Sequence, residues 1–295
     1  MRGELSKVYQ FLRSVDTAHH YETLKSEQRI IELDFPVWPK GRDWSQSVHM
    51  KRLVAELEAR RAEWLDLLRS FACFEQQLRM IPLEPGGNDA EPHWLNAWIP
   101  GLDAVSLYAF TAQKNPGVFL EVGSGNSTKF VRKAIDDHGL KTKIVSIDPF
   151  PRVEIDRICD AIHRVALEEL DLAVFDSLTP DDIVFIDNSH RALPNSDVTV
   201  FFMEVLGRLP KGILYGLHDI FLPVDYPDEW GPRFYNEQYL LAACLFGGAD
   251  GDDIVLPGSF ISRDRELTAA LDVLWQVPHL QGIMPFGGGF WMRKG

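Results

Sequence analysis

The chain has 295 residues, of which 45% are hydrophobic and 25% are charged, with 30 Lys and Arg against 43 Asp and Glu. This length predicts one large domain or two ordinary ones, and the apolar share is enough to build a buried core. The net charge of −13 disfavours nucleic acid or an anionic membrane as the main partner, because both require a basic surface. We therefore expect a small-molecule substrate, with no nucleic-acid or membrane partner.

The cysteines and the first residues indicate the compartment. Cys73, Cys159 and Cys244 are odd in number, far apart and free of any Cys-x-x-Cys pair, which suits a reducing environment. The opening residues MRGELSKVYQFLRSV interrupt their apolar positions with charges, unlike a signal peptide. No stretch approaches the ~20 apolar residues of a membrane span. These features together predict a cytoplasmic chain.

Residues 1–100 are expected to form a helical N-terminal region that serves as a substrate lid or a dimer contact. From about Ser45 to Met80 the pattern is helical, with an apolar stripe that comprises Leu53, Leu57, Trp64, Leu68, Phe71 and Leu78. The stripe either packs on its own domain or forms a helix–helix contact in a homodimer, and both readings stay open. The turn-rich segment 82–92 is the best candidate for a linker.

Residues 101–295 alternate short apolar strands with helical patterns. Strands are predicted at 117–122, 143–148, 182–187 and 212–219, and the segment 155–165 begins as a helix and ends as a short strand. The last part predicts a helix at about 233–246, a strand at 253–260, a helix around 265–275 and a final strand in GGGFWMRKG. This alternation indicates βαβ units around a buried parallel sheet, and hence a doubly wound α/β fold.

The segment EVGSGNST at 121–128 ends one predicted strand and opens a helix. Gly123 and Gly125 let the backbone turn tightly and approach a ligand, and Ser127 is a plausible N-cap for the helix. A dinucleotide fingerprint would require glycine where this chain has Thr128, which weakens that interpretation. Asp148 ends the next strand, where a carboxylate can accept both ribose hydroxyls of a nucleotide cofactor. Glu121 is costly to bury without partners and is expected to organise the loop or meet a cationic part of the ligand.

Two later strands end in polar residues: Asp187 and His190 after one, His218 and Asp219 after the next. Because the carboxyl ends of parallel strands share one crevice, we expect these side chains to converge near the glycine loop. Carboxylates with imidazoles suit a divalent cation of the Mg, Mn, Fe or Zn kind, and they also suit proton abstraction. The aromatic segment 225–240 either walls a substrate pocket or packs on the sheet edge.

These motifs resemble class I S-adenosylmethionine-dependent methyltransferases, in particular the bacterial Methyltransferase_24-like group. The resemblance rests on EVGSGNST, SIDPFPR (146–152), FIDNSHR (185–191) and HDIFLPVDYP (218–227), and it covers roughly residues 100–295. It implies a Rossmann-like seven-stranded sheet whose last strand is antiparallel, with a methyltransferase domain at 101–295. It also implies that Glu121, Gly123, Ser124, Gly125 and Asn126 bind S-adenosylmethionine and that Asp148 binds its ribose hydroxyls.

A looser resemblance is to metal-dependent O-methyltransferases of the catechol type. It places Asp187 at a metal-binding position, His190 where those enzymes have a catalytic lysine, and His218–Asp219 at their acidic–amide pair. We therefore expect transfer of a methyl group to an oxygen of a small molecule or sugar, with Asp187 and His190 in catalysis. A divalent cation such as Mg²⁺ is expected on Asp187, His218 and Asp219. The alternatives are a nicotinamide-dependent oxidoreductase and a non-catalytic cofactor-binding interaction protein.

Overall fold

The computed structural model describes residues 20–26, 29–31 and 33–295. The chain divides into two compact units, residues 1–39 and residues 40–295. In the first unit residues 20–26 are helical, whereas the predicted features of residues 1–19 lie outside the described residues. The second unit contains the sheet together with residues 40–100, so it begins well before the boundary at residue 100 that the sequence suggested. The division into two functional parts at residue 100 stays a prediction.

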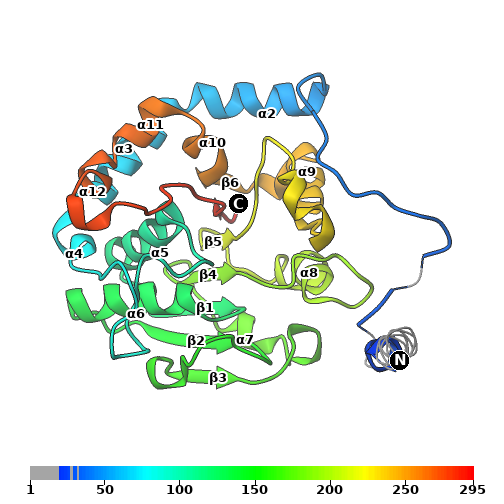
Figure 1. Ribbon diagram of the computed structural model, residues 1–295, viewed down its shortest axis with the longest axis horizontal. Coiled ribbons are helices and arrows are strands. Elements are labelled where there is room, and N and C mark those ends of the chain that lie inside the picture. The colour runs from blue at the N-terminus through cyan, green and yellow to red at the C-terminus, as the bar shows by residue number, and fades with distance from the viewer. Residues whose placement is uncertain (1–19, 27–28, 32) are drawn as a thin grey trace, which may run out of the picture. The chain divides into compact units, whose positions relative to one another are not determined.

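The predicted helix at 45–80 is divided into three, namely α2 (Val48–Ala59), α3 (Arg61–Ala72) and α4 (Glu75–Arg79) (Figure 1). Ser47 caps the first of these helices by accepting a hydrogen bond from the Met50 N–H at 3.4 Å. Every residue of the apolar stripe is buried within the chain. The stripe therefore packs on its own domain and cannot be the face of a dimer, although a homodimer through another surface stays a prediction.

Seven strands form one sheet in the order β3-β2-β1-β4-β5-β7-β6. They are β1 (Val118–Val122), β2 (Lys143–Ile147), β3 (Ala161–His163), β4 (Ile183–Ile186), β5 (Leu214–Leu217), β6 (Asp253–Pro257) and β7 (Phe290–Arg293). The first five strands pair in parallel, and β7 lies antiparallel between β5 and β6. The predicted doubly wound seven-stranded sheet with an antiparallel last strand is therefore confirmed.

The remaining helices connect and flank the strands. The longer ones are α5 (Gly101–Lys114), α6 (Asn126–His138) and α9 (Glu237–Phe246), and the short ones are α7 (Ala173–Asp176), α8 (Asp197–Val200), α10 (Gly258–Ser262), α11 (Arg265–Ala269) and α12 (Asp272–Trp275). A π-helical turn, Phe201–Val205, continues α8. The predicted helix at 265–275 is therefore two short helices, and the turn that separates them begins at Ala270. No helix of the described residues is long and apolar enough to cross a membrane.

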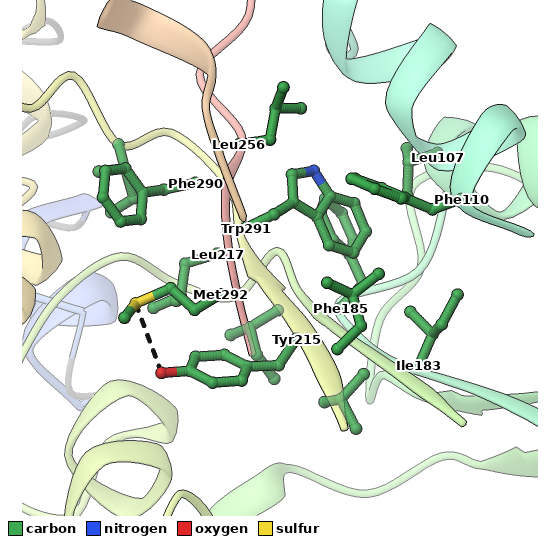
Figure 2. Packing of buried hydrophobic residues seen from close by; sticks show 14 of the residues in the cluster. Leu107, Phe110, Ile183, Phe185, Tyr215, Leu217, Leu256, Phe290, Trp291 and Met292 are labelled. Atoms are coloured by element: carbon green, nitrogen blue, oxygen red, sulfur yellow. Dashed lines mark hydrogen bonds between the residues drawn. The ribbon is translucent and has the colours of Figure 1, made fainter. Parts of the chain in front are cut away.

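The core lies on both faces of the sheet, and strand register decides which residue faces which layer. Phe185, Gly216 and Trp291 share one row across β4, β5 and β7, and Trp291 stacks on Phe185 and meets Phe110 of α5 (Figure 2). The adjacent row faces the other way and pairs Tyr215 with Met292, whose sulfur accepts the Tyr215 hydroxyl at 3.4 Å. With both faces covered, the strands read as continuous apolar runs, and polar residues are left at their ends.

Candidate functional site

The glycine loop joins the end of β1 to α6 and lies against the end of β4. Gly123 has φ 79°, and a Cβ placed there would lie 1.7 Å from the Asp187 carbonyl oxygen. Only glycine permits both this left-handed conformation and this close approach of two backbones. The Gly123 N–H in turn donates to the Ile147 carbonyl of β2 at 2.9 Å. The glycine therefore holds three strand ends together and sets the position of Asp187.

Beneath the loop, Thr128 links the loop to a buried carboxylate. Its hydroxyl donates to Glu121 and accepts the Gly125 N–H at 2.9 Å. Burial raises the pKa of Glu121 to about 7, and its Oε1 has no hydrogen-bond partner among the described residues. The predicted N-cap at Ser127 is wrong, because α6 begins at Asn126 with Gly125 as its N-cap. Thr128 thus performs a structural task that a third glycine could not.

A cavity of about 340 Å³, called here the loop cavity, opens beside these residues. Of the residues predicted to bind the cofactor, Gly123, Ser124, Gly125, Asn126 and Asp148 line it, whereas Glu121 lies beneath the loop. The Asp148 carboxylate accepts the backbone N–H of Ser124 at 2.9 Å and that of Phe150 at 2.7 Å. Asp148 therefore fixes the cavity wall, as expected for a strand-end carboxylate that presents an oxygen to a ligand.

The four predicted polar residues at the ends of β4 and β5 do converge, and we call Asp187, His190, His218 and Asp219 the strand-end cluster. His190 Nε2 lies 3.3 Å from Asp187 Oδ1 and 3.4 Å from Asp219 Oδ2. His218 Nδ1 lies 3.2 Å from Asp187 Oδ1 and 3.6 Å from Asp219 Oδ1. Asp187 also lines the loop cavity. One nitrogen of each imidazole therefore faces the same two carboxylates.

Two buried carboxylates that the sequence did not connect with the cluster lie on its outer side. Glu237 Oε2 of α9 is 2.9 Å from His190 Nδ1, and Asp103 Oδ2 of α5 is 3.0 Å from His218 Nε2. Asp103 also accepts the N–H groups of Gly288 and Gly289, each at 2.8 Å. The available signal was a carboxylate within an apolar helical run, in GLDAVSLYAF and in NEQYLLAA, because such a residue is rarely buried without a partner.

The local backbone and the charges of the cluster are both unusual. His190 and Asp219 adopt left-handed conformations, with φ 58° and 54°, which are rare for residues with a side chain. Burial lowers the pKa of each imidazole, but the surrounding carboxylates outweigh it and raise the pKa of His190 and His218 well above the ordinary value. Burial likewise raises the pKa of Asp187, and the two imidazoles outweigh it and lower that pKa. Strained backbone of this kind is concentrated at functional sites.

A second cavity, of about 690 Å³ and called here the aromatic cavity, adjoins the cluster through Asp219 and Gly288. Its walls are mostly apolar and include Trp94, Trp98, Phe221, Trp230, Met284 and Phe286. Trp98 and Ile99 line both cavities. In the segment 225–240, Trp230 lines this cavity. Gln238 is instead buried in the protein, where its side-chain oxygen accepts the Phe221 N–H at 2.9 Å. Both interpretations of that segment therefore hold in part.

Residues 120–220 match the family model described as a methyltransferase domain. The match contains the glycine loop, Asp148 and the whole strand-end cluster. The match agrees with the resemblance identified in the sequence and covers about a third of the chain. No curated protein sequence matches the chain significantly.

Solved structures with a similar fold include a Thermus thermophilus branched-chain polyamine synthase in complex with N4-aminopropylspermidine and 5'-methylthioadenosine (15% identity, TM-score 0.38). The alignment covers 65% of this chain and 55% of that protein, so the chain spans about half of its length. An SAH-bound Podospora anserina methyltransferase is similar at 13% identity and TM-score 0.39, over 90% of this chain and 100% of that one. A Bacillus cereus O-methyltransferase in complex with SAH is similar at 16% identity and TM-score 0.36, over 66% and 84%.

Proposed function

We propose that the protein transfers a methyl group from S-adenosylmethionine to an oxygen of a planar aromatic hydroxyl compound. One observation carries the proposal: the loop cavity and the aromatic cavity share Trp98 and Ile99. Of the strand-end cluster, Asp187 lines the loop cavity and Asp219 lines the aromatic cavity. A donor in the first cavity and an acceptor in the second would be held side by side. Methyl transfer needs little more than such alignment of the reacting groups.

The loop cavity suits the cofactor in its polar groups. S-adenosylmethionine would supply an activated methyl group on a positively charged sulfur. Asp148 would accept the ribose hydroxyls, because its carboxylate is already oriented by two backbone N–H groups. Glu121 would stabilise the loop from below through Thr128, and its unpartnered Oε1 is free to accept a further hydrogen bond. Asp187, which lines the same cavity, adds negative charge that favours a cationic ligand.

The aromatic cavity favours a flat acceptor. Phe221 stacks on Phe286 with ring centroids 5.6 Å apart, and Trp230 meets Phe221 edge-on at 5.0 Å. Such walls bind aromatic rings through burial and ring–ring contacts. Asp219 is the acidic side chain that lines this cavity, so it would accept a hydrogen bond from the acceptor hydroxyl and orient its oxygen.

The sequence suggested His190 as the base that deprotonates the acceptor. The geometry favours another role, because one ring nitrogen contacts Glu237 and the other lies between Asp187 and Asp219. His190 also lines neither cavity. We therefore propose that Asp219 orients the acceptor and that His190 contacts the carboxylates around it instead.

The oxidoreductase alternative has weaker support. A dinucleotide-binding sheet is mostly parallel, and its loop carries glycine or alanine at the third position of the fingerprint. Here β7 is antiparallel and Thr128 is bonded to Glu121. A non-catalytic cofactor-binding role would leave unexplained why four polar residues meet between two cavities.

Calorimetry with S-adenosylhomocysteine tests cofactor binding in the wild type, Asp148→Asn and a matched control, Asp160→Asn. Asp160 also accepts a backbone N–H, from Ile144 at 2.9 Å, but lies outside both cavities. We expect the affinity to fall at least tenfold in Asp148→Asn, because a hydrogen bond to a charged group contributes ~1.5–3 kcal/mol. The control should bind normally. Absence of binding to the wild type would refute the proposal.

A methyl-transfer assay with radiolabelled S-adenosylmethionine tests the acceptor. Phenols and catechols should be methylated on oxygen, and hexoses and primary amines should not. Methylation of a sugar with no turnover of any phenol would keep the methyltransferase activity and overturn the aromatic acceptor.

A further inference from the structure

The two imidazoles of the strand-end cluster are each oriented from outside by a buried carboxylate, which methyl transfer alone does not require. His190 Nδ1 contacts Glu237 and His218 Nε2 contacts Asp103, at 2.9 and 3.0 Å. An ionised carboxylate can only accept, so each of these outer nitrogens carries the N–H. The inner nitrogens then present lone pairs toward one point when the rings are neutral. Metal-ligating histidines are held in this way, with the second nitrogen bonded to a carboxylate.

The distances inside the cluster are long for charge-assisted hydrogen bonds. The four inner nitrogen–oxygen distances run from 3.2 to 3.6 Å. Charge-assisted hydrogen bonds between nitrogen and a carboxylate are shorter, roughly 2.7–2.9 Å. Donor atoms that share one cation through bonds of about 2.0–2.2 Å lie roughly 2.8–3.6 Å apart. The inner spacing therefore fits donors that share one cation, and in its absence the shortest inner contact, His218 Nδ1 to Asp187 Oδ1, is a hydrogen bond.

The charge balance favours the same conclusion. Four buried or nearly buried carboxylates, Asp103, Asp187, Asp219 and Glu237, surround two imidazoles. Within residues 40–295 the ion pairs of these carboxylates are with histidine alone, and none is with lysine or arginine. Buried charges are normally paired or coordinate a metal. A divalent cation between the two inner carboxylates would offset this excess of negative charge.

We propose that Asp187, His190 and His218 form a binding site for one divalent transition metal, with Asp219 beside it and Asp103 and Glu237 as positioning residues. Two imidazole nitrogens and a carboxylate oxygen suit Mn²⁺, Fe²⁺, Co²⁺ or Zn²⁺, whereas Mg²⁺ prefers oxygen ligands. The proposal differs from the Mg²⁺ site expected from the sequence, because His190 becomes a ligand. It does not depend on the proposed function. If that function holds, the cation would add positive charge that favours the deprotonated form of an acceptor hydroxyl in the aromatic cavity.

Metal content provides the test. The full-length wild type is stripped with a chelator, dialysed separately against Mn²⁺, Co²⁺, Zn²⁺ or Mg²⁺, and analysed by plasma mass spectrometry. We expect close to one Mn²⁺, Co²⁺ or Zn²⁺ per chain and little Mg²⁺. In His190→Ala and His218→Ala the affinity should fall at least tenfold. His163→Ala, which removes a histidine of β3 outside the cluster, should retain the metal.

A variant of a residue that contacts a ligand, but is not itself a ligand, separates loss of metal binding from loss of folding. Glu237→Gln leaves all three proposed ligands in place but replaces the acceptor on His190, and such changes typically weaken metal binding about 10–100-fold. The absorption spectrum of bound Co²⁺ should change in this variant, and circular dichroism should not. Unchanged Co²⁺ affinity and spectrum in Glu237→Gln would remove the positioning role.

The wild type alone is enough to overturn the proposal. If the stripped protein binds none of the transition metals, or binds Mg²⁺ as tightly as Mn²⁺, the site is not the one proposed. S-adenosylhomocysteine binding is measured on the same metal-free sample. Cofactor binding without metal binding would overturn the metal site and leave the proposed function standing. Metal binding without cofactor binding would overturn the proposed function and leave the metal site standing.

Discussion

Replacement of Gly123 by alanine should damage the protein more than an ordinary glycine substitution, because the backbone of another strand end fills the space. The added Cβ would lie 1.7 Å from the Asp187 carbonyl oxygen and 2.6 Å from its carbonyl carbon. Neither atom belongs to a flexible side chain, so β1 or β4 must shift. The variant also forces alanine into a left-handed conformation with φ 79°.

Gly139 provides a matched control, since it is left-handed at φ 60° and a Cβ there would meet no atom within 4 Å. Its alanine variant carries only the conformational cost, roughly 1–2 kcal/mol, whereas Gly123→Ala adds an overpacking cost of about 1–3 kcal/mol. At about 2–4 °C per kcal/mol, we expect losses in melting temperature of roughly 2–8 °C for Gly139→Ala and 4–20 °C for Gly123→Ala.

Differential scanning calorimetry of the wild type and both variants makes the comparison. Metal and S-adenosylhomocysteine binding should also fall in Gly123→Ala, because Asp187 moves with the displaced strand end, and should stay normal in Gly139→Ala. If Gly123→Ala loses no more stability than Gly139→Ala and binds both ligands normally, the close approach of the two strand ends is not what selects glycine.

Three further outcomes follow from the structure. Burial raises the pKa of Glu121 from 4.5 to about 7, so its carboxyl contributes stability that is present below pH 4.5 and is lost as the pH rises through about 7. The loss amounts to about 3 kcal/mol. Melting curves of Glu121→Gln between pH 5 and 8 should not show it. Trp64 is buried and donates to the Leu57 carbonyl at 3.0 Å, so Trp64→Ala should lower the free energy of unfolding by about 3–5 kcal/mol and leave the sedimentation coefficient of the native protein unchanged. Trp98 is half exposed and lines both cavities, so Trp98→Ala should raise the KM for a phenolic acceptor about tenfold in steady-state kinetics with little change in melting temperature.

The sequence was sufficient for the architecture, because parallel strands buried on both faces leave an unambiguous pattern of apolar runs. It also located the polar residues that follow those runs. Asp187, His190, His218 and Asp219 could be placed together before any coordinates, since strand ends of a parallel sheet share one edge. Thr128 already counted against a dinucleotide site, and the antiparallel β7 agrees with that inference.

Long-range partners could not be derived in this way. Asp103 and Glu237 lie 115 and 47 residues from the histidines they contact, and no local periodicity connects them. The stripe from Leu53 to Leu78 was compatible with a dimer until the structure showed what covers it.

The sequence by itself determined the sheet, the glycine loop and the identity of the polar strand ends, because hydrophobic period and turn chemistry act over a few residues. Tertiary structure decided which nitrogen of each histidine faces which carboxylate. It also decided that two cavities meet at Trp98 and Ile99, and that Gly123 has no room for a side chain. These features depend on how helices and strands far apart in the chain pack in space, and side-chain chemistry at the site is fixed only at that level.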